Sequence, residues 1–164
     1  MAERAEHHAP RGEFAYAAAV YGSVLVTALV GAAFEAHLDA RTMTLTLLTT
    51  TVVFWLAHVW SEVMGVRLAG AIPDWSNVRR IALSEWPVVE AGVVPDGLLA
   101  LAWVGVYSRD TGAGLAMIAA VLQLAGWGFA AGWRTQHRLA PAIVTGLVDC
   151  AFGVAIVGLE IAIH

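Results

Sequence analysis

The chain has 164 residues, of which 59% are hydrophobic and 13% are charged, and its formal net charge is −4. Soluble domains carry about 25% charged residues, so this composition excludes an ordinary water-covered surface, and apolar runs of about 18 residues or more predict membrane-spanning helices. All nine basic residues are arginines, which excludes a lysine Schiff base to retinal or pyridoxal, and a single cysteine excludes an internal disulfide.

Residues 1–13 are polar and mixed in charge, and we expect them to form a cytoplasmic tail. The uncharged run at 14–34 is longer than the apolar core of a signal peptide, which has about 7–15 residues, so it predicts a retained first span. Small residues in this run, including Gly22 and Ser23, allow another helix to approach closely.

The second predicted span covers residues 43–66, and one helical face of it collects Thr44, Thr51, Trp55, His58 and Glu62. Threonines such as Thr44 and Thr51 can bond back to their own helix carbonyls and need no other partner. His58 and Glu62 are four residues apart, so they share a face about one turn apart. An ionisable pair inside a membrane span is costly, and it is therefore a candidate functional site.

The longest polar interruption of the chain precedes the third predicted span. Residues 74–86 predict a short amphipathic helix at the inner membrane surface, capped by Asp74 or Ser76. The span itself covers 87–107 and contains Glu90, Pro95 and Asp96. Pro95 cannot donate a backbone hydrogen bond, so we expect a bend that presents Asp96 near the middle of the membrane.

Two more spans complete the predicted bundle. After a turn at 108–114, the fourth span covers 115–133, with Gln123 at its centre and a GxxxG pair that favours close packing within one chain or between copies. The fifth span covers 141–163 and contains Asp149. The sequence thus predicts an all-α, polytopic membrane bundle, with five transmembrane helices and one interfacial helix in a single domain over 14–164.

The distribution of arginines predicts the orientation of the bundle. Seven of the nine arginines flank one side of the predicted spans, and only Arg41 and Arg109 flank the other. The positive-inside rule then places the amino terminus in the cytoplasm and the carboxyl terminus outside. The lysine-free, alanine-rich composition is typical of some bacteria, so we expect the inner (plasma) membrane of a bacterium.

Depths estimated from a rise of about 1.5 Å per residue place polar side chains of four spans in the inner half of the bilayer. Isolated charges facing lipid cost several kcal/mol each, so we expect these side chains to converge on one hydrated internal site. The candidate site residues are His58, Glu62, Glu90, Asp96, Gln123 and Asp149.

Three functions fit such a site. The first is movement of protons or a small cation past its carboxylates and histidine. The second is a membrane-embedded enzyme in which His58, Glu62, Asp96 and Asp149 ligate a divalent transition metal. The third is a non-catalytic accessory subunit of a membrane complex.

No GxSxG, P-loop, HExxH or dinucleotide-binding motif occurs, so the sequence assigns no catalytic residue. Five spans make a thin bundle, and we expect a homo-oligomer surrounded by lipid. Arginines scattered along an acidic chain predict no nucleic-acid partner.

Overall fold

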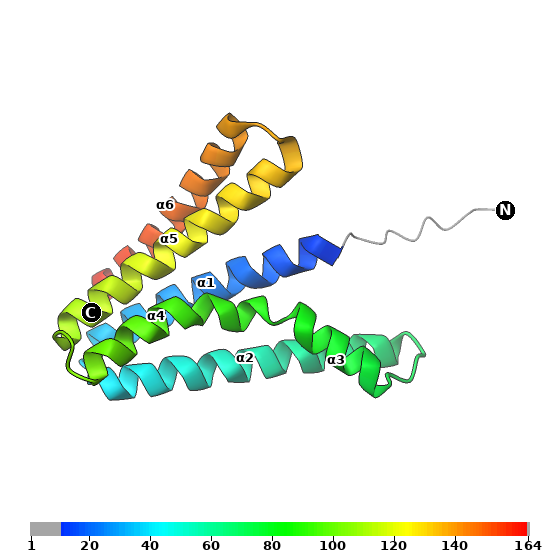
Figure 1. Cartoon of the computed structure of the whole chain (residues 1–164), viewed down its shortest axis with the longest axis horizontal. Coiled ribbons are helices and arrows are strands. Elements are labelled where there is room, and N and C mark those ends of the chain that lie inside the picture. Colours follow the sequence, from blue (N-terminus) through cyan, green and yellow to red (C-terminus); the bar gives the residue numbers. More distant parts are fainter. Residues whose placement is uncertain (1–10, 164) are drawn as a thin grey trace.

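A computed structural model describes the backbone of residues 11–163, with side chains described for 17–159 and Ala162, and no strand occurs in this part of the chain (Figure 1). Residues 1–10, which form most of the predicted tail, lie outside the described residues. The described elements are α1 (Arg11–Glu35), α2 (Ala40–Leu68), α3 (Trp75–Ser84), α4 (Pro87–Trp103), α5 (Arg109–Gln136) and α6 (Leu139–Ile163).

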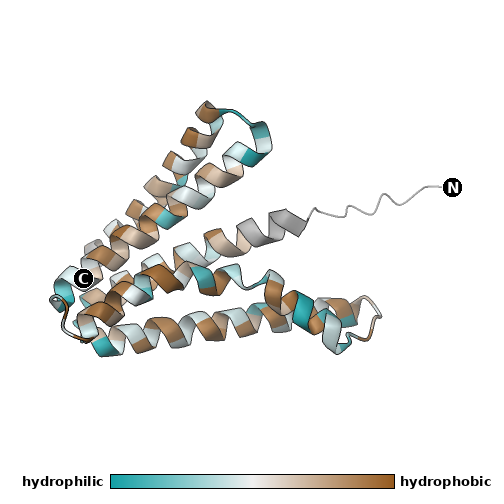
Figure 2. Ribbon diagram, in the orientation of Figure 1, coloured by the Kyte–Doolittle hydropathy of each residue, from teal (hydrophilic) through white to brown (hydrophobic). Residues whose placement is uncertain are grey.

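Four segments within the described helices are long and apolar enough to cross a membrane. They are Ala17–Glu35, Ala40–Leu68, Arg109–Gln136 and Leu139–Leu159. Figure 2 shows apolar residues along the lengths of these helices and hydrophilic ones gathered largely at turns and on α3. The helix α4, which corresponds to the third predicted span, has 17 residues. At about 1.5 Å per residue it is about 25 Å long, somewhat less than the hydrocarbon core of a bilayer.

Side-chain caps determine where three helices begin. Asp39 accepts a hydrogen bond from the Thr42 amide at 3.0 Å, and Asp74 accepts one from the Asn77 amide at 2.8 Å. The Asp74 cap confirms the start predicted for the short helix. Ser108 accepts from the Thr111 amide at 3.2 Å, and this cap starts α5 at Arg109.

Several predicted boundaries were wrong for identifiable reasons. The fourth span was expected at 115–133, but the Ser108 cap starts the helix earlier and the residues expected to form a turn are helical. The third span was expected to reach residue 107, but Gly105 has φ +84° and ends α4 at Trp103, with the Val106 amide bonded to the Leu101 carbonyl. Residues 11–13, expected in the tail, belong to α1.

The bend expected at Pro95 stays a prediction. The helix α4 continues through Pro95, and the interruption falls at Glu85 and Trp86, between α3 and α4. Pro87 at the first position of α4 explains this location. Proline has no amide hydrogen, and at the first position of a helix an amide hydrogen would have no partner within the helix.

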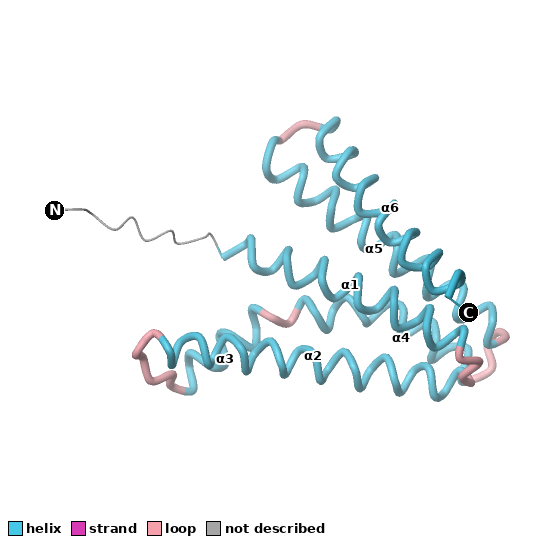
Figure 3. The backbone as a smooth tube through the Cα atoms, turned by 180° about the vertical axis from the view of Figure 1, so that it is seen from behind, coloured by secondary structure: helices cyan, strands magenta, loops and turns pink. Residues whose placement is uncertain are grey.

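The helices run back and forth, so their connections gather at two ends of the molecule (Figures 1 and 3). One end holds the start of α1, the connections around α3 and the turn between α5 and α6. We call it the arginine-rich end, because the arginines of those segments lie there. The opposite end holds the α1–α2 and α4–α5 turns and the end of α6.

The apolar core lies toward the opposite end, between α1, α2, α4 and α5. Its buried members are Val26, Val30, Ala33, Met43, Leu47, Leu99, Ala113, Ala116 and Ala120. Glycines bring the backbones together: a Cβ at Gly22 would lie 2.9 Å from the Ala91 Cβ, which confirms the close approach predicted for the first span. Toward the arginine-rich end the α5–α6 hairpin diverges from the other helices (Figures 1 and 3).

Candidate functional site

Helices α2 and α4 are antiparallel and pack against each other, and α3 extends α4 along the same side of α2. We call this contact the α2–α4 seam. The Trp55 indole N–H donates to the Ala82 carbonyl at 2.9 Å, and the Trp55 ring meets the Trp86 ring edge-on at 5.7 Å. Further along, a Cβ at Gly92 would lie 3.2 Å from Thr51 Oγ1. These contacts fix which residues of the two helices lie at the same level of the seam.

His58 lies at the arginine-rich end of the seam, against α1. Its ring contacts the Tyr21 ring, with centroids 5.0 Å apart, and its Nδ1 lies 2.8 Å from the Phe54 carbonyl oxygen. Because a carbonyl oxygen only accepts hydrogen bonds, this contact places the hydrogen on Nδ1. Nε2 is then left as the nitrogen that can accept a hydrogen bond.

Glu85, which the sequence analysis did not single out, lies at the same level as His58. It is 8% exposed and is the only buried charged side chain among the residues whose side chains are described. Burial raises the pKa of the Glu85 carboxyl, the charge of nearby His58 opposes this rise, and the charge of Glu62 adds to it. His58 and Glu62 thus lie close enough to Glu85 for their charges to act on its carboxyl.

Asp96 lies further along the same seam, on α4. Its Oδ1 is buried and has no hydrogen-bond partner among the described residues. The side chain lines a cavity of about 260 Å³ whose other members are Leu48, Thr51, Val89, Gly92, Val93, Gly97 and Ala100. Thr51 donates its hydroxyl hydrogen to the Leu47 carbonyl at 2.7 Å, so only oxygen lone pairs of Thr51 remain for a ligand.

The bond from Thr51 and the one from Thr44 to the Ala40 carbonyl at 2.8 Å confirm the predicted back-bonding of the threonines of α2.

Two of the predicted site residues are exposed: Glu62 lies on α2 and Glu90 on α4, and Glu90 does not line the cavity that contains Asp96. Gln123 is half-buried on α5.

Asp149 is on α6, and its carboxylate lies directly against Gly128 of α5. One helical turn away, the Thr145 hydroxyl lies against Gly132. The GxxxG pair of α5 therefore packs against α6 of the same chain. Because α6 packs mainly on α5 and α1, Asp149 is not brought to the α2–α4 seam.

The predicted convergence of six side chains on one site is therefore not what the structure contains. His58 and Glu62 are grouped with Glu85, Asp96 lies further along the seam, and Gln123 and Asp149 belong to the α5–α6 hairpin. Among the described residues, no three His, Cys, Asp or Glu side chains are close enough together to hold a metal ion. The metal-site alternative thus has no ligand group in this part of the chain.

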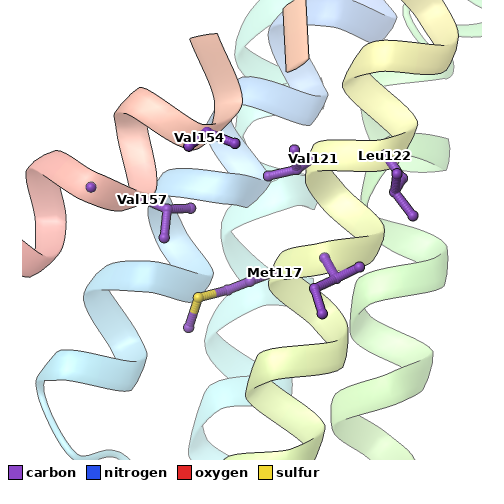
Figure 4. Close-up of a pocket in the computed structure, with 7 residues that line it drawn as sticks. Met117, Val121, Leu122, Val154 and Val157 are labelled. Carbon is purple, nitrogen blue, oxygen red and sulfur yellow. The ribbon is translucent and has the colours of Figure 1, made fainter. Parts of the chain in front are cut away.

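A second cavity, of about 360 Å³, lies between α5 and α6 (Figure 4). Its lining is apolar throughout: Met117, Ile118, Val121, Leu122, Val154, Val157 and Gly158. Its lining offers no side chain that could bind an ion or exchange a proton.

No protein-family model, no curated protein and no solved structure matches this chain.

Proposed function

We propose that this is a small bacterial inner-membrane protein that moves protons or a small cation along the α2–α4 seam. The observation that carries the proposal is that ionisable side chains occupy two levels of one helix–helix contact. Glu85 and His58 lie at the arginine-rich end. Asp96 shares a cavity with Thr51, which is seven residues, or about 10 Å, from His58 along α2.

Each group has a distinct role in this proposal. His58, Glu62 and Glu85 attract the ion at the arginine-rich end and exchange its proton with water. Asp96 holds the ion within the bundle, because its buried Oδ1 has no other partner among the described residues. Intramembrane carboxylates and histidines that face a cavity are the usual elements of proton relays. Asp149 and Gln123 lie outside this path, and Asp149 serves the packing of α6 on α5.

The proposal includes α4 as a fifth span. This helix packs against α1, α2 and α5, and its two ends lie at the same two ends of the bundle as theirs. A helix enclosed in this way crosses the membrane whenever its neighbours do, although its 17 residues alone are short for the task. The amphipathic helix α3 then lies near the membrane surface.

The orientation in the proposal follows the arginines. The arginine-rich end faces the cytoplasm, with the carboxyl terminus outside. Among the arginines whose side chains are described, only Arg41 and Arg109 belong to the opposite end, where Arg109 donates to the main-chain carbonyls of Phe34 and Leu38 and Arg41 lies over the Trp103 ring.

We also propose that the protein works as a homo-oligomer. The seam cavity opens at the side of the bundle, where its lining residues Leu48 and Val93 are 49% and 60% exposed. A second copy covering these side chains would enclose the ion path that one copy leaves open to lipid.

A flux measurement in liposomes tests the proposal. Purified protein is reconstituted with a pH-sensitive dye inside, and proton, Na⁺ or K⁺ gradients are imposed under a clamped membrane potential. We expect Asp96→Asn to lower the flux roughly tenfold or more, because the amide cannot exchange a proton or neutralise a cation. Glu90→Gln, a matched change on the exposed side of the same helix, is expected to leave the flux unchanged.

Equal fluxes for the wild type and Asp96→Asn would contradict the assigned path. A correctly folded wild type that carries no flux of any of these ions would contradict the function itself and would favour the accessory-subunit alternative.

A further inference from the structure

The cavity between α2 and α4 has an unusual mixture of groups for an ion site. Its ionisable group is one carboxylate, that of Asp96, and the Thr51 hydroxyl provides one more oxygen. The remaining lining consists of aliphatic side chains and two glycines. A bound molecule would therefore meet one negative charge at one side of the cavity and hydrocarbon over most of the rest.

This lining is a poor match for an inorganic cation. Ca²⁺ takes about 6–8 oxygen ligands and Mg²⁺ requires a near-octahedral set, whereas the side chains here offer one carboxylate and one hydroxyl. Transition-metal sites use three or four protein ligands, and no group of three candidate ligands occurs among the described residues. A metal ion would have to keep most of its water in contact with valine and leucine side chains.

A small organic ammonium ion matches the same lining at every point. Its positive nitrogen can pair with the Asp96 oxygen that has no partner among the described residues, and its apolar substituents can contact Leu48, Val89 and Val93. The volume of about 260 Å³ lies just below the range of about 300–1,000 Å³ for drug-sized ligands, so the ligand is small.

The position of the cavity also suits a ligand of this class. Leu48 and Val93 line its open side and face the surroundings of the bundle. A lipophilic cation that has partitioned into the membrane can enter there without passing through the core of the protein. The larger α5–α6 cavity is lined by apolar residues alone, so it lacks the charged group that would select a cation.

We propose that the cavity formed by Asp96, Thr51 and the aliphatic side chains of the α2–α4 seam binds a small lipophilic organic ammonium ion. This inference rests on the proposed function, because it names the class of cation that the seam would carry.

Equilibrium dialysis of the purified full chain in detergent tests the proposal. The probe is labelled benzyltrimethylammonium, and the competitor is neopentylbenzene, which has the same shape but carries carbon in place of the charged nitrogen. We expect saturable binding at one site per chain, with the neutral competitor weaker by roughly tenfold or more, because only the cation offsets the negative charge of the buried carboxylate. Asp96→Asn should remove this preference for the cation, and Glu90→Gln should retain it.

A second variant tests the cavity without altering its charge. A Cβ at Gly97 meets no atom within 4 Å, so Gly97→Leu can place its side chain in the cavity and leave Asp96 intact. We expect Gly97→Leu to abolish binding of benzyltrimethylammonium. Gly126→Leu is the matched control, because a Cβ at this glycine of α5 also meets open space and lies outside the cavity.

The results separate this inference from the proposed function. Unchanged binding in both Asp96→Asn and Gly97→Leu, or equal affinity for the neutral competitor, would overturn the inference. Proton flux without any binding of the probe would overturn the inference and leave the function standing. Charge-selective binding without ion flux would support the site and refute transport of protons or inorganic cations.

Discussion

At the scale of single residues, Arg109 connects two turns at the end opposite the arginine-rich one. Its Nε donates to the Leu38 carbonyl at 2.8 Å and its Nη2 to the Phe34 carbonyl at 2.6 Å, while the guanidinium lies 4.6 Å from the centre of the Phe34 ring. The Phe34 carbonyl lies in the last turn of α1, where a helix favours positive charge, and Leu38 lies in the turn that follows. One side chain thus joins the α1–α2 turn to the start of α5.

Replacing this arginine tests whether its planar guanidinium, which donates to two carbonyls at once, stabilises the fold. We expect Arg109→Lys to lower the free energy of unfolding by about 1–3 kcal/mol, because lysine keeps the charge but cannot reach both carbonyls in the same geometry. Thermal unfolding followed by circular dichroism in detergent measures the change. Arg79→Ala, on the exposed surface of α3, is the control, and an equal loss in both variants would contradict the role of Arg109.

Glu85 makes stability depend on pH in a defined direction. Burial raises the pKa of its carboxyl above the ordinary value of 4.5, with His58 opposing and Glu62 adding to the rise. The folded state therefore binds this proton more tightly than the unfolded state does. The stabilising contribution is complete below about pH 4.5 and is lost as the pH rises through the raised pKa of the folded state.

Glu85→Gln should remove that dependence, because its side chain does not ionise. We expect the stability of the variant relative to the wild type to increase as the pH rises above the ordinary value for a glutamate. Unfolding by denaturant at a series of pH values measures the difference. A constant difference over the whole series would show that Glu85 is not buried as described.

At the scale of secondary-structure elements, α5 and α6 are held together by reciprocal contacts of glycines. Asp149 of α6 lies against Gly128 of α5, and Thr145 of α6 lies against Gly132 of α5. In the other direction, a Cβ at Gly146 of α6 would lie 3.2 Å from the Phe129 Cβ. Small residues at such positions let membrane helices approach closely without any hydrophobic driving force between them.

A valine at Gly132 should force the two helices apart. Main-chain atoms of α6 leave no room for a side chain at Gly132, because a Cβ there would lie 2.8 Å from the Ala142 Cα. Backbone atoms cannot move away as a flexible side chain can. We expect Gly132→Val to lower the free energy of unfolding by about 2 kcal/mol or more. The control is Gly126→Ala on the same helix, where a Cβ meets open space and a stabilisation of about 0.5–1 kcal/mol is expected. A stable Gly132→Val variant would contradict this packing.

The elements show what sequence patterns can and cannot predict. Long apolar runs predicted the helices because lipid requires internally paired backbone, and Asp74 predicted a cap because its oxygen satisfies a free amide. The start of α5 was missed, because Gly112 and Gly114 suggest a turn when neighbours are ignored. Gly112 is helical because it lets α5 pack against α4, where a Cβ would lie 2.5 Å from the Ala102 Cβ.

At the scale of the whole molecule, the same limitation applies to the candidate site. Depth along a helix can be estimated from the sequence, and on that basis Asp96, Gln123 and Asp149 were expected together. Which helices are neighbours at that depth depends on packing, and the α5–α6 hairpin diverges from α2 and α4 (Figures 1 and 3). Glu85 was missed because a glutamate in a polar connection is usually solvated, and only the fold of α3 against α2 buries it.

The bundle is asymmetric along its length, and this bears on how an ion would pass. Ionisable side chains lie along the seam from the arginine-rich end, whereas the opposite end is filled by the apolar core of α1, α2, α4 and α5. In the proposed function, water reaches Asp96 from the arginine-rich end, and passage to the other side requires the core to open. The central claim is therefore that the seam cavity is hydrated in the membrane.

Cysteine labelling at two adjacent positions of α4 tests that claim most directly. Val93 lines the cavity and Val94 does not, although their exposed fractions are similar at 60% and 55%. Each is replaced by cysteine in a Cys150→Ala background and treated in proteoliposomes with a water-soluble thiol reagent. The proposed function predicts that Val93→Cys, in a water-filled cavity that a second copy closes off from lipid, reacts and that Val94→Cys, outside this cavity, does not. Equal protection of both cysteines would show that the cavity is dry and would contradict ion passage along the α2–α4 seam.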